Sequence, residues 1–425
     1  MKSYNVTIQP GPLSGSIDIP PAKSMLHRAL IAAALSRGES MIEPIILSDD
    51  VLATINAIKG IGAQVTIENN RAFVRGIKTI KRQEKIIDVY DSGSTLRFMI
   101  PIASLASRSI TFNVRESLRQ RPLTIYNHIF KDDLIQDGHH ITINGTLEPG
   151  DYTIDGTLSS QFISGLMFTL PLLKAPSKLY VTNPSSKMYI DLTIETLEAF
   201  NIEIQDTDYG YYIKGSQTYK PTNFNVHGDF SQAAFFLTAG LTNKNIRVRN
   251  LDIDSFQADK AFIDIVKKMN GKFLNQEDGY SSVFSHLNGA TIDLDACPDL
   301  GPVLALLATQ AKGTTKLINA KRLRYKESDR IVSTVKTLSA LGANIDNTED
   351  SIIIHGKTAL KGGVTLDSYH DHRIVMMASI AATFCKFPVT IRDAHFVEKS
   401  YPHFFKDLKS LGAEITYEEV LHDNT

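Results

Sequence analysis

The hydrophobic positions of this chain form a unit that recurs about every 70 residues and appears six times. Each copy opens with an apolar, alanine-rich stretch typical of a buried helix, and an amphipathic stretch follows it. Polar residues precede or open each apolar stretch, which predicts where the first helices begin. These starts lie at Lys23-Ser24, Ser94-Thr95, Ser159-Ser160, Asp229-Phe230-Ser231, Pro298-Asp299 and Asp371-His372.

The amphipathic stretch usually ends in a glycine or polar turn and leads into alternating residues typical of a strand. Residues 58–65 and 338–345 show this clearly, whereas residues 129–143 form the weakest copy. Turn residues at 68–71 and 348–351 then predict a second strand that pairs with the first. The whole unit therefore has a βαβαββ pattern.

Six such units cannot each bury their own faces, so neighbouring units must share a core. Grouped by threes, they predict an α/β (α+β) protein with two similar domains. Proline and glycine interrupt the pattern at Pro20-Pro21 and near Gly228, so we expect the chain to cross between domains there. One domain would combine residues 1–20 with 228–425, and the other would span 21–227. We also expect a strand at residues 1–6 and fraying after Val420.

Composition narrows the function classes. The chain has 425 residues and a formal net charge of -1, so it lacks the basic excess that holds nucleic acid or an anionic membrane surface. The two cysteines, Cys297 and Cys385, have no metal-binding or CxxC spacing. No signal peptide or apolar run of membrane-spanning length is evident. We expect a cytoplasmic monomer that acts on small molecules.

The stretch from Arg322 to Arg330 carries six charges in nine residues, just before a helical pattern of apolar residues. This pattern places Glu327 and Ser328 at the helix start, where free backbone N–H groups and the helix dipole favour negative charge. Lys326 and Arg330 lie four apart and are expected to share a helix face. A solvated first turn is the alternative interpretation, because most charge runs are exposed.

Basic residues also accompany the early helix starts. Lys23 lies at the first helix start, where free N–H groups can bind a phosphate or carboxylate, and Arg28 follows five residues later. A Gly/Ser-rich turn at residues 91–97 allows close approach of backbone to an anion. The loop at residues 115–121 carries three arginines suited to bidentate anion binding. Solvated loops are the alternative, and nucleotide binding has no support because neither GxxxxGK[ST] nor GxGxxG occurs.

The remaining helix starts are weaker signals when taken singly. Plain N-capping is the favoured interpretation of Ser159-Ser160-Gln161 and of Asp299, and the segment from Ser186 to Tyr189 carries the same weak signal. His370 and His372 lack a third ligand with obvious spacing, so we expect no metal and favour Arg373 as an anion ligand. Lys399 completes the set. Together the six starts predict a cationic pocket between two domains that binds a small substrate with several negative charges.

With these motifs the chain resembles the 5-enolpyruvylshikimate-3-phosphate (EPSP) synthase family over nearly its whole length. The most specific matches are residues 323–330 and 371–373, supported by residues 22–24, 92–97, 121–122 and 159–161. The resemblance implies two domains of three units each that close over substrate, with the active site in the cleft between them. Asp91 and Arg322 stand where the family often has Asn, so their roles stay open.

The resemblance also implies the roles of individual residues. Those implied to bind phosphoenolpyruvate are Lys23, Gly93, Arg97, Arg121, Gln161, Lys326, Arg330, Arg373 and Lys399. Those implied to bind shikimate 3-phosphate are Lys23, Ser24, Arg28, Ser159, Ser160, Gln161, Ser186, Tyr189, Asp299 and Lys326. Asp299, Glu327, Lys23 and Lys326 are the candidate catalytic groups.

The implied reaction adds the 5-hydroxyl of shikimate 3-phosphate to C2 of phosphoenolpyruvate and then eliminates phosphate, without a cofactor. We assign proton transfer at C3 to Glu327 and at the 5-hydroxyl to Asp299, although the roles could be exchanged or shared with a lysine. One rival is the carboxyvinyl transferase acting on a UDP-sugar, which generally has a reactive Cys in the loop equivalent to residues 115–121. Others are a nucleic-acid-binding scaffold and an ATP-using RNA-end-processing enzyme.

Overall fold

The computed structural model describes residues 3–84 and 86–420, which form two compact units. One unit combines the chain up to Pro20 with the chain from Gly228 onward, and the other spans Pro21–His227. The frayed tail expected after Val420 and the first two residues of the expected N-terminal strand lie outside the described residues. We call the units the 21–227 unit and the 228–420 unit, and each is described by itself.

The described residues form six four-stranded sheets, three in each unit, and all six share one pattern: a parallel pair followed by two antiparallel pairings. In the 21–227 unit the first sheet has the order β14 (Asn223–Asn225), β3 (Glu39–Glu43), β5 (Arg71–Arg75), β4 (Gln64–Glu68). The second has the order β6 (Ile86–Asp88), β7 (Ile110–Asn113), β9 (His140–Ile143), β8 (Leu134–Asp137). The third has the order β10 (Asp151–Asp155), β11 (Ser177–Thr182), β13 (Gly210–Ile213), β12 (Gln205–Thr207).

The other unit has the same arrangement. The first sheet has the order β22 (Thr365–Leu366), β23 (Val389–Ile391), β1 (Tyr4–Ile8), β24 (Ile415–Glu419). The second has the order β2 (Gly15–Asp18), β15 (Ile246–Arg249), β17 (Gly279–Val283), β16 (Lys272–Gln276). The third has the order β18 (Thr291–Asp293), β19 (Gly313–Ile318), β21 (Ile352–Gly356), β20 (Ile345–Asn347). The first strand of the chain thus lies between two of the last strands, as expected for a strand that belongs with the C-terminal half.

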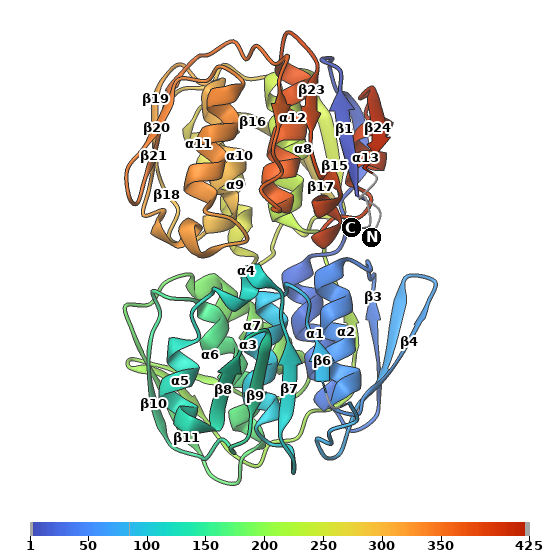
Figure 1. Ribbon diagram of the computed structural model, residues 1–425, viewed down its shortest axis with the longest axis vertical. Coiled ribbons are helices and arrows are strands. Elements are labelled where there is room, and N and C mark those ends of the chain that lie inside the picture. Colours follow the sequence, from blue (N-terminus) through green and yellow to red (C-terminus); the bar gives the residue numbers. More distant parts are fainter. Residues whose placement is uncertain (1–2, 85, 421–425) are drawn as a thin grey trace. The chain divides into compact units, whose positions relative to one another are not determined.

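The first helix of each repeat is almost wholly buried, which confirms the prediction from its alanine-rich sequence. These helices are α1 (Lys23–Leu35), α3 (Gly93–Ala103), α6 (Ser160–Thr169), α8 (Phe230–Thr242), α10 (Gly301–Thr309) and α12 (His372–Phe384). In Figure 1 the helices of each unit lie inside its sheets. Their observed first residues lie within two positions of the predicted starts. Four of these helices have a polar N-cap whose side chain accepts a hydrogen bond from the first turn, which is the signal used for the prediction. The caps are Ser92, Ser159, Asp229 and Asp371.

The second helices are half exposed, again as their amphipathic pattern predicts. They are α2 (Asp49–Gly60), α5 (Thr124–Phe130), α7 (Lys187–Ala199), α9 (Ala261–Lys268), α11 (Arg330–Ala340) and α13 (Phe404–Ser410). The weakest copy, which is the second along the chain, contains the seven-residue α5. The predicted hairpin turn at residues 68–71 joins β4 to β5 through Asn69 and Asn70, whose φ angles of 50° and 61° fit the left-handed region that asparagine tolerates.

The predicted helix start at Glu327 and Ser328 is wrong. A short 3-10 helix, η5 (Lys321–Tyr325), is followed by a bend at residues 326–328, and α11 begins only at Arg330. Asp329 is the N-cap, and its Oδ1 accepts hydrogen bonds from the backbone N–H groups of Ile331 and Val332 at 3.1 Å each. A short carboxylate side chain satisfies two helix-end donors at once, so the helix starts after it. Lys326 therefore lies in a loop and shares no helix face with Arg330.

Candidate active site: two cationic clusters

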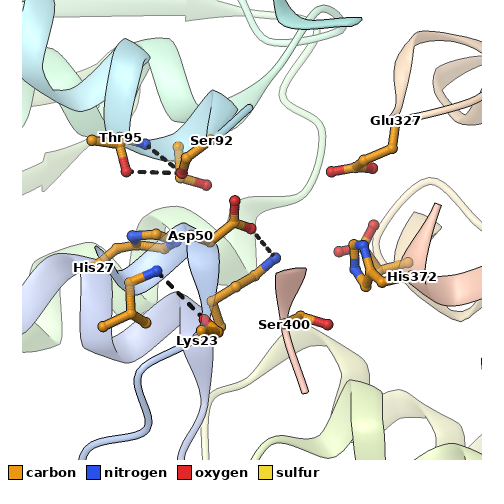
Figure 2. Close-up of polar contacts among 12 residues, drawn as sticks. Lys23, His27, Asp50, Ser92, Thr95, Glu327, His372 and Ser400 are labelled. Atoms are coloured by element: carbon orange, nitrogen blue, oxygen red, sulfur yellow. Dashed lines mark hydrogen bonds and ion pairs between the residues drawn. The ribbon is translucent and has the colours of Figure 1, made fainter. Parts of the chain in front are cut away.

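The first cluster lies in the 21–227 unit at the N-terminal ends of its buried helices. Lys23 is the first residue of α1, and its Nζ lies 2.7 Å from Oδ2 of Asp50, in the first turn of α2. Figure 2 shows the two side chains turned toward each other. Asp50 is buried and Lys23 is partly exposed, so the carboxylate holds the ammonium in one direction at the helix start.

Two guanidinium groups approach the turn that opens α3. A Cβ atom added at Gly93 would lie 3.0 Å from Nη1 of Arg121 and 3.4 Å from Nη1 of Arg97. Both arginines are buried, and Arg97 donates a 2.7 Å hydrogen bond to Oε1 of Gln161 in the first turn of α6. Three predicted phosphoenolpyruvate ligands thus meet above one glycine. Two converging buried cations make this a suitable place for an anion.

Arg28 joins α1 to α7 and is largely occupied by this task. Its guanidinium donates to the Thr193 hydroxyl at 2.7 Å and to the backbone carbonyls of Ser24 and Tyr189 at 2.8 and 2.9 Å. Burial lowers the pKa of Arg28 to about 10, so the group remains charged at neutral pH. Three of its five N–H groups are used, and two remain for a ligand. Arg28 therefore brings Ser24 and Tyr189 together whether or not it contacts substrate.

The predicted serine ligands follow two neighbouring parallel strands. Ser159 caps α6 after β10, and Ser186 precedes α7 after β11. The two loops lie side by side, because the N–H of Gly156 donates to the carbonyl of Thr182 at 2.8 Å. Further along the helices, Ser164 and Thr193 join α6 to α7 through a 2.7 Å hydrogen bond. Both serines thus lie at the same edge of one sheet.

The second cluster lies in the 228–420 unit and centres on Asp299, which belongs to the 3-10 helix η4 (Pro298–Leu300) just before α10. Its Oδ1 lies 3.0 Å from both Lys326 Nζ and Arg330 Nη1, and its Oδ2 lies 3.1 Å from Arg373 Nη2. Burial raises the pKa of Asp299, but these three cations outweigh burial and hold the pKa well below its usual range. Asp299 is therefore a carboxylate at neutral pH.

Arg330 is the most deeply buried cation of this cluster, with 1% of its surface exposed. Its Nη2 donates to Glu327 at 2.6 Å, and its Nε and Nη2 donate to the two oxygens of Asp371 at 2.8 and 3.1 Å. Burial lowers the pKa of Arg330, but Asp371, Glu327 and Asp299 raise it more, so the guanidinium stays charged. It holds three carboxylates at fixed positions.

Arg373 retains donors for a ligand. Its Nη2 is bonded to Asp299 and, at 3.0 Å, to the Ser231 hydroxyl in the first turn of α8. Among the described residues, its Nε and Nη1 are buried without a hydrogen-bond partner. Lys399 is buried at the end of the 3-10 helix η6 (Ala394–Lys399), and the carbonyl of the next residue, Ser400, accepts a 3.0 Å bond from Gln232.

The structure adds two carboxylates that the sequence analysis did not assign to the site. Asp50 fixes Lys23, and fully buried Asp371 fixes Arg330 while capping α12 and accepting from the Ser328 hydroxyl at 3.0 Å. Their position in the first turn or N-cap of a helix was the available signal. The two residues left open have local partners: Asp91 accepts from the Ser117 hydroxyl at 2.6 Å, and Arg322 donates to the carbonyl of Asp295.

Other kinds of site find little support in the described part of the chain. No group of three or more His, Cys, Asp or Glu side chains gathers there that could hold a metal ion. Cys297 and Cys385 are both buried and unpaired by disulfide, and burial raises the pKa of each thiol. Within the same residues, no helix combines the length and apolar character needed to cross a bilayer.

Comparison with known proteins shows the family of this chain. The family model for EPSP synthase (3-phosphoshikimate 1-carboxyvinyltransferase) matches residues 8–408. A 3-phosphoshikimate 1-carboxyvinyltransferase from Clostridium novyi is 45% identical, covering 97% of this chain and 98% of the relative. One from Clostridium acetobutylicum is 44% identical, covering 96% and 98%.

Solved structures share the fold at lower identity. EPSP synthase from Acinetobacter baumannii superposes with a TM-score of 0.81 at 24% identity, covering 97% of this chain and all of that one. The enolpyruvyl transferase NikO from Streptomyces tendae also gives 0.81, at 16% identity, covering 99% of this chain and 100% of that chain. These matches confirm the predicted fold class.

Proposed function

The chain belongs to the EPSP synthase family and acts as a 3-phosphoshikimate 1-carboxyvinyltransferase, and we propose that its two cationic clusters bind the two substrates of this reaction. The observation that carries the proposal is the convergence of Arg97 and Arg121 above Gly93. Phosphoenolpyruvate carries a carboxylate and a phosphate, which planar guanidinium groups bind with two hydrogen bonds each. Gln161 adjoins this place through its hydrogen bonds with Arg97 and Ser94, and Lys23 belongs to the same unit.

Shikimate 3-phosphate is assigned to the neighbouring helix starts of the same unit. The serine hydroxyls at the starts of α6 and α7 suit its phosphate, because they adjoin helix N-termini. Ser24, Tyr189 and the two remaining N–H groups of Arg28 suit the polar groups of its ring. This arrangement supports Ser159, Ser160 and Ser186 as phosphate ligands.

We assign the proton transfers to the Asp299 cluster. The reaction forms a bond between the 5-oxygen and C2 of phosphoenolpyruvate, removes the hydroxyl proton and adds a proton at C3; elimination returns the C3 proton to the enzyme and releases phosphate. Asp299 and Lys326, 3.0 Å apart, form an acid/base pair for the 5-hydroxyl. Glu327, held by Arg330 at 2.6 Å, is assigned to C3. Arg373, Arg330 and Lys399 stabilise the anionic adduct.

Three broader statements are part of the proposal. The two units are domains that close over the substrates, so that both clusters reach one pair of ligands. The protein acts as a monomer in the cytoplasm and needs no nucleic acid. No cofactor takes part, because proton transfer and cationic stabilisation account for each bond that forms or breaks.

The test is a phosphate-release assay with phosphoenolpyruvate and shikimate 3-phosphate, run beside an identical assay with a UDP-sugar acceptor. Release only with shikimate 3-phosphate supports the proposal. Release only with the UDP-sugar would assign the chain to the rival transferase, although residues 115–121 contain no cysteine for it. No release with either acceptor would refute the proposed substrates.

A further inference from the structure

Helix α2 carries none of the residues assigned to substrate, yet two of its side chains contact the helices that do. Asp50 and Thr54 lie four residues apart and so share one face of α2. Asp50 pairs with Lys23, and Thr54 Oγ1 lies 2.6 Å from Nδ1 of His27. Lys23 and His27 are also four apart on α1. The two helices are thus joined by two polar contacts one turn apart.

The inner contact continues to α3. Thr54 Oγ1 lies 2.7 Å from Thr95 Oγ1, and Thr95 Oγ1 lies 2.8 Å from the hydroxyl of Ser92, the N-cap of α3. His27 and Ser92 are 1% exposed, and Thr54 and Thr95 are fully buried. Figure 2 shows His27 near Lys23 and Asp50, and it marks the contact between Thr95 and Ser92 with dashed lines. The Thr54 hydroxyl thus connects α1, through Thr95 and Ser92, to the turn that holds Gly93.

This chain of polar groups lies among alanine, leucine and isoleucine side chains, where an unsatisfied polar group destabilises the fold. Apolar helix faces repack with small energy differences, whereas a hydrogen bond tolerates only a few tenths of an ångström. Sliding α1 past α2 by one helical turn of about 5.4 Å would break both contacts. The network therefore specifies the register of α1 and α3 more sharply than the apolar packing does.

We propose that Thr54 is a positioning residue for carboxyvinyl transfer, which holds Lys23 on α1 in register with Gly93 and Arg97 on α3. The proposal rests on the proposed function, because it takes these three residues as ligands of phosphoenolpyruvate. Ser24 and Arg28, the shikimate 3-phosphate ligands that share α1 with Lys23, are also held to α7, because Arg28 donates to Thr193 and to the carbonyl of Tyr189. The ligands on α6 and α7 are not joined to Thr54 by this network. Loss of the Thr54 hydroxyl should consequently weaken the binding of phosphoenolpyruvate more than that of shikimate 3-phosphate.

The test compares Thr54→Val, which keeps the shape and removes the hydroxyl, with Thr54→Ser, which keeps the hydroxyl. Thr196→Val is the matched control, because Thr196 is fully buried on α7 and donates only to the carbonyl of Leu192 in its own helix, at 2.8 Å. Melting temperature, the KM for phosphoenolpyruvate and the Kd for shikimate 3-phosphate are measured for each full-length variant.

We expect Thr54→Val to raise the KM for phosphoenolpyruvate roughly 10-fold, since displaced ligands lose much of their effect. The Kd of Thr54→Val for shikimate 3-phosphate should change less than about 2-fold. The KM of Thr54→Ser for phosphoenolpyruvate should stay within about 2-fold of the wild-type value. Thr196→Val should lower the melting temperature without changing the KM. A Thr54→Val enzyme with the wild-type KM, or with equal losses for both substrates, would overturn the positioning role. Phosphate release by the wild type is measured first. If the wild type releases no phosphate from the two substrates, the proposed function fails; if it does, the variants test the positioning role alone.

Discussion

The ammonium of Lys326 lies 3.0 Å from Oδ1 of Asp299, so a candidate proton donor and a candidate base are already paired in the 228–420 unit. Burial lowers the pKa of Lys326, and the nearby Arg330 and Arg322 lower it further, although Asp299 opposes them. Burial raises the pKa of Asp299, but Arg373, Lys326 and Arg330 together hold it low. The pair thus keeps a charged carboxylate beside an amine that releases its proton more easily than an ordinary lysine.

This pair predicts the alkaline limb of the pH profile. Because the pKa of Lys326 is lowered, kcat/KM should fall as the pH rises through a value below the ordinary 10.5 of lysine. Lys326→Arg keeps the charge at higher pH, so its residual activity should lose this limb or show it at higher pH. Lys321→Arg, at an exposed lysine in the same segment, should leave the profile unchanged. An identical alkaline limb in Lys326→Arg would exclude Lys326 as the titrating group.

Removing the titrating group at Glu327 should slow chemistry more than binding. Glu327→Gln keeps the shape, and Arg330 remains held by Asp371 and Asp299. We expect kcat to fall roughly 10²- to 10⁴-fold, with far smaller changes in substrate affinity. In deuterated water the wild type should also introduce deuterium at C3 of phosphoenolpyruvate during reversible turnover. Glu349→Gln, at an exposed glutamate, is the control. If Glu327→Gln incorporated deuterium at C3 at the wild-type rate, C3 protonation would belong to another group.

The cations of the 21–227 unit should matter individually. Lys23→Ala and Arg121→Ala should each lose on the order of 2 kcal/mol or more of transition-state stabilisation, because a bound anion is left short of a partner. Lys59→Ala and Arg119→Ala are matched controls, since both side chains are exposed. The measurement is the kcat/KM of each purified variant, with its melting temperature as a check on folding. Full activity in either Ala variant would show that the replaced residue is not part of the site.

The space above Gly93 should be sensitive to one methyl group. In Gly93→Ala the new Cβ would lie 3.0 Å from Arg121 Nη1, so that guanidinium tip must move by a few tenths of an ångström, and it would be in contact with Arg97 Nη1 at 3.4 Å. We expect the KM for phosphoenolpyruvate to rise roughly 10-fold or more, and the Kd for shikimate 3-phosphate to stay nearly constant. Gly150→Ala is the control, because its Cβ would meet nothing within 4 Å. An unaltered KM in Gly93→Ala would place phosphoenolpyruvate elsewhere.

Ligand-driven closure of the two units is a further prediction. Each unit has its own cationic cluster, and like charges repel until anions bind between them. Saturating shikimate 3-phosphate should reduce the radius of gyration and raise the melting temperature. Small-angle scattering measures the first quantity, with shikimate lacking the phosphate as the control ligand. A radius that does not respond to the phosphorylated ligand would contradict closure.

The sequence by itself determined the repeat, the buried and half-exposed helices and most helix starts, because these depend on local periodicity and capping. The same local information failed at Glu327, where Asp329 competes successfully for the helix-end N–H groups. Only the tertiary structure decided that β14 pairs with β3 and that Asp299, Arg330 and Asp371 meet. Such contacts join residues far apart in the chain, and their distances depend on how helices from different repeats pack, which no local pattern encodes.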